Sequence, residues 1–325
     1  MRARFVFEEI KFERGKDPKG AMGIGRMAQI KQDYENDWYK EFSPEEALIW
    51  ASMRGKPEYV NYLLLYGVDP NYDDGKALYD AMDHPEIVRL LLDAGMNKES
   101  LAAGLEPAIK KSLELVKMLV DAGASLNDPD LLWQAIWSND NIEVIKYLFS
   151  NGAKIKDHSN IQSTLGYQDN MFELLKLFLS HGLKLKKTDY DILNSSASRG
   201  DSEAIKILID YGFKVKGEPG GLALIPAARG GNIETAKLLI NAGADLDTTE
   251  TETSYWVEHF SALTRAAEVG NTEMVKFLLD AGADVKVLND KAHRIARKNG
   301  QTETLELIKH YKKMARMKAR QNKKA

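Results

Sequence analysis

The sequence predicts an all-α fold: a solenoid of short helical repeats, with an extended strap and a capping helix at the N-terminal end. A short segment recurs eight times, each copy with a glutamate and, nine residues later, a glycine. Apolar residues lie seven, four and three positions before each glycine, which places them on one face of a helix. A second apolar segment precedes each glutamate. Each unit is therefore predicted to be helix–turn–helix followed by a loop.

The glycine of each unit stands where a helix C-cap needs a left-handed residue. Lys or Arg follows the glutamate by three residues in seven units, and the two side chains can pair weakly on the solvent side. The eight pairs are Glu58/Gly67, Glu86/Gly95, Glu114/Gly123, Glu143/Gly152, Glu173/Gly182, Glu203/Gly212, Glu234/Gly243 and Glu273/Gly282. A ninth unit has Glu303 but ends in Tyr311 without the glycine.

These units resemble ankyrin repeats, most closely in "SALTRAAEVGNTEMVKFLLDAGADV" (261–285). Ser261–Ala262–Leu263–Thr264 stands where the family has its Thr-Pro-Leu-His start, so Thr264 replaces the histidine that normally bonds the turn. The resemblance covers residues 46–311, about nine repeat units. It implies a protein-binding module without catalytic activity, which recognises its partner in a concave groove.

The N-terminal segments precede the repeats. Residues 1–27 are predicted to form an extended strap, and residues 28–45 a capping helix region. At "SPEE", Ser43 is the expected N-cap, Pro44 the first helical residue and Glu46 the partner in a capping box. Residues 4–13 have the composition of a strand, but no other segment of the chain reads as strand, so an extended strap on the first repeats is favoured.

The glycines at 20, 23 and 25 raise two alternatives for the strap. One is a phosphate-binding loop, although the glycine order is the reverse of the dinucleotide fingerprint and no β-α-β context surrounds it. The other is a docking peptide for another protein. We favour a structural strap in which Pro18 and the glycines turn the chain into the capping helix.

The loops depart from the family pattern in both directions. Successive glycines are 28 to 31 residues apart, then 39 at the last step, against a usual period of about 33. Short loops predict stunted rim hairpins over the first six units. Units four and five are the most eroded, because "STLGYQDNMFE" (163–173) has no clean register.

The long loop before the eighth unit, residues 247–260, carries Tyr255, Trp256 and Phe260. These aromatic residues either fold over neighbouring helices or are exposed for a partner. Aromatic residues carry much of the binding energy at interfaces, so this loop is the predicted hot spot. Acidic residues Glu250, Glu252 and Glu258 would form its polar rim. Tyr255, Trp256, Glu258 and Phe260 are therefore candidate partner-binding residues.

The other candidate partner-binding residues come from the first helix of each unit, just past a pair of small residues. They change in sign of charge along the stack, which suits a specific protein partner that the chain would bind, inhibit or sequester. They are Met53, Arg54, Asp83, His84, Lys110, Lys111, Trp137, Arg199, Arg229 and Glu268.

The sequence predicts no enzyme, cofactor or metal site. It contains no P-loop, no His-Glu-x-x-His and no Gly-x-Ser-x-Gly motif. Cysteine is absent, and the six histidines are scattered through the units. A metal site needs several ligands that converge, so isolated histidines favour surface or turn positions.

Residues 312–325 form a predicted basic C-terminal tail. Residues 309–325 contribute +8 to a net charge of −3, which leaves −11 on the rest of the chain. The tail either keeps the protein solvated or contacts nucleic acid or an acidic partner, although the acidic body disfavours broad nucleic-acid binding. Without a secretory signal or a membrane-length apolar run, a cytoplasmic location is expected, and the chain alone is expected to be monomeric.

Overall fold

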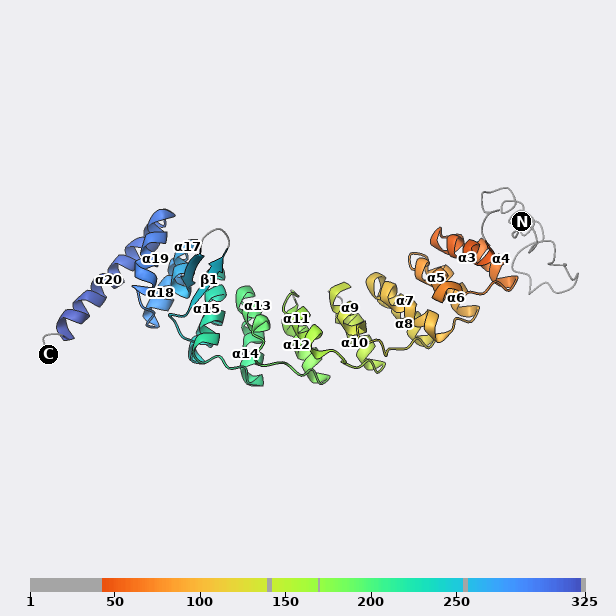
Figure 1. Ribbon diagram of the computed structural model, residues 1–325, viewed down its shortest axis with the longest axis horizontal. Helices are drawn as coiled ribbons and strands as arrows, with labels where there is room; N and C mark the ends of the chain where they lie inside the picture. Colours follow the sequence, from red (N-terminus) through yellow and green to blue (C-terminus); the bar gives the residue numbers. More distant parts are fainter. Residues whose placement is uncertain (1–42, 139–141, 169, 254–256, 323–325) are drawn as a thin grey trace, which may run out of the picture. The chain divides into compact units, whose positions relative to one another are not determined.

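The computed structural model describes residues 43–138, 142–168, 170–253 and 257–322. The chain divides into two compact parts, Met1–Lys156 and Asp157–Ala325. Each part is a stack of helix pairs, and each pair consists of two consecutive helices (Figure 1). The described residues contain nine such pairs, which confirms the predicted all-α repeat architecture. The strap (1–27) and all but the end of the capping helix region lie outside the described residues.

The first part contains four helix pairs, with the first helix of each pair carrying an odd label. They are α3 Pro44–Met53, α4 Pro57–Leu65, α5 Tyr72–Asp80, α6 Pro85–Asp93, α7 Lys98–Lys111, α8 Leu113–Asp121, α9 Leu131–Ser138 and α10 Ile142–Ser150. The predicted capping box opens α3: the Ser43 hydroxyl accepts from the Glu46 N–H at 3.2 Å, and the Glu46 carboxylate accepts from the Ser43 N–H at 2.7 Å.

The second part contains five helix pairs and a β-hairpin. Its helices are α11 His158–Leu165, α12 Met171–Ser180, α13 Asp191–Arg199, α14 Ser202–Tyr211, α15 Glu218–Gly230, α16 Ile233–Asn241, α17 Ala262–Val269, α18 Thr272–Asp280, α19 Val287–Lys298 and α20 Thr302–Asn322. Thr264, which replaces the family's histidine, forms a capping box with Ser261, the N-cap of α17. Its hydroxyl accepts from the Ser261 N–H at 2.7 Å and donates to the Ser261 carbonyl at 2.8 Å.

The repeating glycine is the device that ends each second helix. All eight recurring glycines have positive φ, from 79° to 107°, as predicted for a left-handed C-cap. The residue four positions earlier, such as Leu63 or Leu278, is buried in all eight units. Each unit thus contributes the same apolar stripe to the core of its part, because a single helix pair cannot bury its own apolar face.

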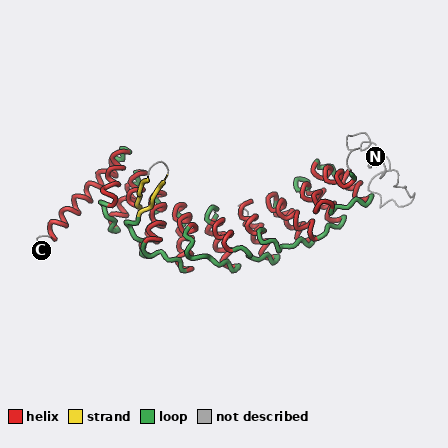
Figure 2. The backbone as a smooth tube through the Cα atoms, in the orientation of Figure 1, coloured by secondary structure: helices red, strands yellow, loops and turns green. Residues whose placement is uncertain are grey.

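The hairpin consists of β1 Thr249–Thr253 and β2 Val257–Ser261, paired antiparallel so that Thr249 faces Ser261. The expectation that no segment beyond the N-terminus reads as strand was wrong here. Strand β1 alternates threonine with glutamate, and the β-branched threonines favour extended backbone even without an apolar face. The hairpin packs on α15, α17 and α19 and stands out as the yellow element in Figure 2.

A glycine on α15 allows the base of this hairpin to come close. A Cβ atom added to Gly221 would lie 2.1 Å from the Thr248 hydroxyl and 2.5 Å from the Asp245 carbonyl. Thr248 is buried there, and its hydroxyl donates to the Asp245 carboxylate at 3.1 Å. Any larger residue at position 221 would push the start of β1 away from the stack.

The last helix is much longer than its equivalents. Helix α20 has 21 residues, whereas α18 has nine. The helix continues because Lys312 occupies the position at which the other units have their glycine. The basic stretch after Tyr311 is therefore helical through Asn322.

We expect the centre of the chain to be its least protected region. Helix α11 buries Gln162 and Thr164 beside Ile161 and Leu165, so half of its buried positions are polar. Less apolar burial lowers the free energy of local opening. Amide hydrogen exchange should be fastest in residues 157–172. Protection there equal to that of α16 and α18 would contradict this expectation.

Candidate functional site

The candidate residues of the first helices occupy equivalent positions, at or just beyond the C-terminal end of each helix. We call this set the first-helix row: Met53, Arg54, Asp83, His84, Lys110, Lys111 and Trp137 in the first part, and Arg199, Arg229 and Glu268 in the second. His84 and Glu268 are half-buried, and the other eight are exposed. Equivalent positions in stacked repeats line up, so each part presents a surface made from several units.

Trp137 is the most prominent member of the row in the first part. Its residue is 55% exposed at the end of α9, and its ring lies edge-on to Trp133 one turn earlier, with 6.5 Å between ring centroids. Helical spacing of four residues places both indoles on the same face of α9. An indole left this exposed offers a large, rigid apolar contact to another molecule.

Ion pairs hold several charges of the row in place, one between two units and one within α7. The Lys111 ammonium contacts the Asp83 carboxylate at 2.6 Å, which lowers the pKa of Asp83 mainly through that hydrogen bond. The Lys110 ammonium contacts Glu106 at 2.5 Å, and this hydrogen bond raises the pKa of Lys110. Both shifts favour the charged forms, so this part of the row keeps its alternating charges throughout the neutral pH range.

His84 is held in place by a glycine of the preceding unit. A Cβ atom at Gly55 would lie 2.4 Å from the His84 ring, and Gly55 has a φ of +65°. The imidazole therefore rests against bare backbone, which accounts for its partial burial. Met53 and Arg54, immediately before this glycine, remain exposed.

In the second part, a buried arginine connects the row to the hairpin. The side chain of Arg265, on α17, is only 7% exposed. Its guanidinium contacts the Glu250 carboxylate of β1 at 2.9 Å and the Glu268 carboxylate at 3.0 Å. The guanidinium carbon also lies 3.5 Å from the ring centroid of Phe260. A buried cation with two carboxylates and an aromatic face keeps its charge, because these partners replace water.

Lys291, on α19, completes this arrangement. Its ammonium lies 3.6 Å from the centroid of the Phe260 ring and donates to the His259 carbonyl at 2.8 Å. We call Glu250, Phe260, Arg265, Glu268 and Lys291 the Arg265 cluster. It ties both hairpin strands to α17 and α19.

The long loop thus has two kinds of candidate residue. Phe260 is 4% exposed and packs in the Arg265 cluster, so it can serve a binding site through the hairpin that it anchors. Tyr255 and Trp256 lie outside the described residues, and the backbone of Glu258 lies in β2.

Burial raises the pKa of Asp247 at the start of this loop. The hydrogen bond that the Asp247 carboxylate accepts from the Asp284 N–H has a smaller, opposing effect on this pKa.

Depressions lie on both sides of the hairpin. One, of about 220 Å³, includes Arg229 and Glu250 among its lining residues. Another, of about 490 Å³, is lined by Glu268 and Phe260 together with the bases Lys291, Arg294 and Lys298 of α19. The hairpin therefore forms a wall shared by two concavities, each of which contains a member of the first-helix row.

Sequence reasoning missed Arg265 and the basic face of α19. The signal for Arg265 was its position directly before the small pair Ala266–Ala267, on a helix that is buried almost throughout. A charge at such a position needs a partner. For Lys291, Arg294 and Lys298 the signal was helical spacing, since positions three and four apart share one face.

Neither metal-binding groups nor membrane spans were found where the structure is described. No three His, Asp or Glu side chains in that part of the chain gather closely enough to hold a metal ion. None of its helices combines the length and apolar content needed to cross a bilayer.

The architecture defines a class: a helical-repeat protein whose stacked units present side chains from equivalent positions. Comparison with family models identifies the repeat. A model described as ankyrin repeats (3 copies) matches residues 27–101 and 165–250, and one described as ankyrin repeats (many copies) matches residues 224–279. The chain belongs to the ankyrin-repeat family, whose members are in general protein-interaction modules and non-enzymatic scaffolds.

Two curated relatives are similar to parts of the chain. Over 141 residues the chain is 26% identical to R599, an ankyrin repeat protein of Acanthamoeba polyphaga mimivirus; the match covers 42% of this chain and 38% of that protein. Over 188 residues it is 26% identical to SAT10, an ankyrin repeat domain-containing protein of Stachybotrys chartarum, covering 54% of this chain and 10% of that protein. The chain thus spans well under half of the length of either relative.

Proposed function

We propose that the chain binds a protein partner through the first-helix row and the loop of residues 247–260, and that it inhibits or sequesters this partner. The carrying observation is the exposed indole of Trp137 within a row of exposed, chemically varied side chains. Interface hot spots are enriched in tryptophan and arginine, and the row contains both. Ion pairs such as Lys111–Asp83 hold charges of both signs in place, which favours one partner over others.

The hairpin supports the proposal in the second part. The Arg265 cluster holds both strands against α17 and α19, so Glu250 and Phe260 of the candidate loop have fixed positions before a partner binds. Strand residues that are held in place in this way lose less conformational entropy when a partner binds. The concavities beside the hairpin give a partner's side chains two places to enter.

The proposal is tested with the full-length chain as an affinity bait and then by titration. A protein retained from a lysate of the source cells is purified and its Kd measured by calorimetry. Trp137→Ala should weaken binding by about 2 kcal/mol, or about 30-fold in Kd, without a change in melting temperature. Trp256→Ala, the hot spot expected from the sequence, should have a similar effect in the same titration.

Tyr72→Ala is the matched control. Tyr72 is an exposed aromatic residue at the N-terminal end of α5, whereas the first-helix row lies at the C-terminal ends of the first helices. Its loss should leave Kd within about two-fold, because scattered exposed aromatic residues contribute little to binding. If Tyr72→Ala weakens binding as much as Trp137→Ala, or if Trp137→Ala has no effect, the first-helix row is not the binding surface.

A further inference from the structure

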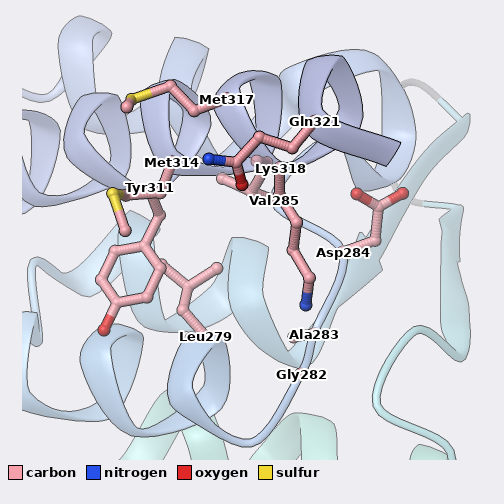
Figure 3. A pocket seen from close by; sticks show the side chains of 11 residues that line it. Leu279, Gly282, Ala283, Asp284, Val285, Tyr311, Met314, Met317, Lys318 and Gln321 are labelled. Atoms are coloured by element: carbon pink, nitrogen blue, oxygen red, sulfur yellow. The ribbon is translucent and has the colours of Figure 1, made fainter. Parts of the chain in front are cut away.

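A groove of about 640 Å³ lies between the C-terminal half of α20 and the turn that follows α18. We call it the C-terminal groove. Leu279, Ala283 and Val285 line it from the side of the turn, and Tyr311, Met314 and Lys318 line it from α20 (Figure 3). It belongs neither to the first-helix row nor to the hairpin.

The groove exists because α20 extends beyond the end of α18, the helix that it packs against. Helix α20 packs on α18, and its buried residues Thr304 and Ile308 lie on the contacting face. The same face continues at Tyr311, Ala315 and Lys318, with the three- and four-residue spacing of a helical stripe. Helix α18 ends at Asp280, so the later part of this face has no neighbouring helix within the described chain.

The overhanging part of α20 is fixed to the stack at its root. The Tyr311 hydroxyl donates a hydrogen bond to the carboxylate of Asp280, the last residue of α18. The Lys312 ammonium contacts the Asp290 carboxylate of α19 at 3.0 Å, and its side chain is largely buried. The two walls of the groove are therefore held in position before any ligand binds, which lowers the entropic cost of binding.

Its surface is apolar at one end and polar at the other. Tyr311, Met314 and Leu279 gather at one end, whereas Lys318, Gln321 and Asp284 lie at the other (Figure 3). Met314 and Met317 are 53% and 50% exposed. Methionine side chains are flexible and polarisable, so they adapt to the apolar side chains of a bound helix.

The charge of the overhang selects the ligand. From Lys312 to Arg320, α20 carries five basic residues and no acidic one. Asp284 is the acidic residue in the lining, and its carboxylate accepts a hydrogen bond from the Lys286 N–H at 2.9 Å. An apolar strip bordered by this much positive charge complements a ligand with apolar and acidic faces.

We propose that the C-terminal groove binds an acidic amphipathic helix of a partner protein, placed beside the overhang of α20 in line with α18. The lining positions from Tyr311 to Gln321 extend over about 15 Å of helix, enough for about three turns of a ligand helix. Such a helix would cover the α20 face that α18 leaves open, with its acidic residues toward the bases of α20. A second copy of α20 would instead bring two basic helices together.

A display library of helix-favouring peptides, each about 14 residues long, tests this proposal against the immobilised full-length chain. Enriched peptides should carry apolar residues at three- and four-residue spacing and a net negative charge. The most enriched peptide is then labelled, and its Kd is measured by fluorescence anisotropy. Lys318→Glu and the double variant Met314→Ser/Met317→Ser should each raise Kd about ten-fold or more.

Lys313→Glu is the matched control, since it makes the same charge change on α20 at a residue outside the groove lining. Lys313 contributes only to the overall charge of the overhang, whereas Lys318 lines the groove, so Lys313→Glu should raise Kd less than about three-fold at physiological salt. Trp137→Ala should leave peptide binding unchanged, which separates this proposal from that for the first-helix row. Circular dichroism confirms that each variant is folded.

The proposal is overturned if no peptide is enriched, if the enriched peptides are neutral or basic, or if Lys313→Glu weakens binding as much as Lys318→Glu. Phosphatidylserine vesicles and a single-stranded DNA oligonucleotide are titrated in parallel. Binding of either that is tighter than that of the peptide and is lost in Met314→Ser/Met317→Ser would assign the groove to a membrane or to nucleic acid instead.

Discussion

Replacing Phe178 with alanine should lower the free energy of unfolding by about 4 kcal/mol. Phe178 lies on α12 and is the largest fully buried side chain in the described chain. Its removal loses the transfer free energy of an aromatic ring and leaves a cavity that helices on all sides fill only in part. Urea denaturation followed by circular dichroism measures the change.

Phe172→Ala is the control on the same helix, because Phe172 is half-buried. It should cost about 1–2 kcal/mol, since part of the ring is already in water. Equal losses for the two variants would mean that α12 does not present the face assigned to it. The comparison matters because α12 lies in one of the two units whose sequence departs most from the repeat.

Replacing Arg265 with methionine should cost about 3 kcal/mol, because it removes one partner from a buried charge network and leaves two carboxylates facing each other. Methionine preserves most of the apolar stem, so the loss reports on the guanidinium. The side chains of Glu250 and Glu268 are about one third exposed, so water will partly solvate their carboxylates. The expected loss of stability is therefore smaller than for a fully buried ion pair.

Two further variants interpret the result. Arg229→Met makes the same change at an exposed position and should shift stability by no more than about 0.5 kcal/mol. Arg265→Lys retains the charge but cannot reach both carboxylates with one planar group. Its free energy of unfolding should therefore lie between those of Arg265→Met and the wild type. A stable Arg265→Met protein would show that the cluster does not hold the hairpin.

The repeat itself could be predicted from the sequence because it depends on local, periodic patterns of residues. The glycines need left-handed backbone, and all eight have it. The apolar stripe needs one buried helix face, as Leu278 illustrates. Capping at Ser43 depends on residues three apart. Each of these signals is complete within a few residues, so neighbours far along the chain do not alter it.

The hairpin and the groove depend on contacts between distant residues, and the sequence showed them less clearly. Strand β1 has no apolar alternation, and what makes it a strand is its partner β2 and the glycine at 221 that lets it approach α15. The C-terminal groove arises from a difference in length between α18 and α20. The absence of a glycine at position 312 is compatible with a longer helix. Which face of that helix remains uncovered depends on where α18 ends, and this is visible only in the structure.

The hairpin also changes how the last three units share their stability. In an ideal stack each unit touches only the next, so the total is a sum of single-unit and nearest-neighbour energies. Here β1 packs on α15 while β2 packs on α17 and α19, and Lys291 of the ninth unit reaches the same Phe260 ring as Arg265 of the eighth. This adds a coupling between second neighbours, so we expect units seven to nine to gain or lose their structure together.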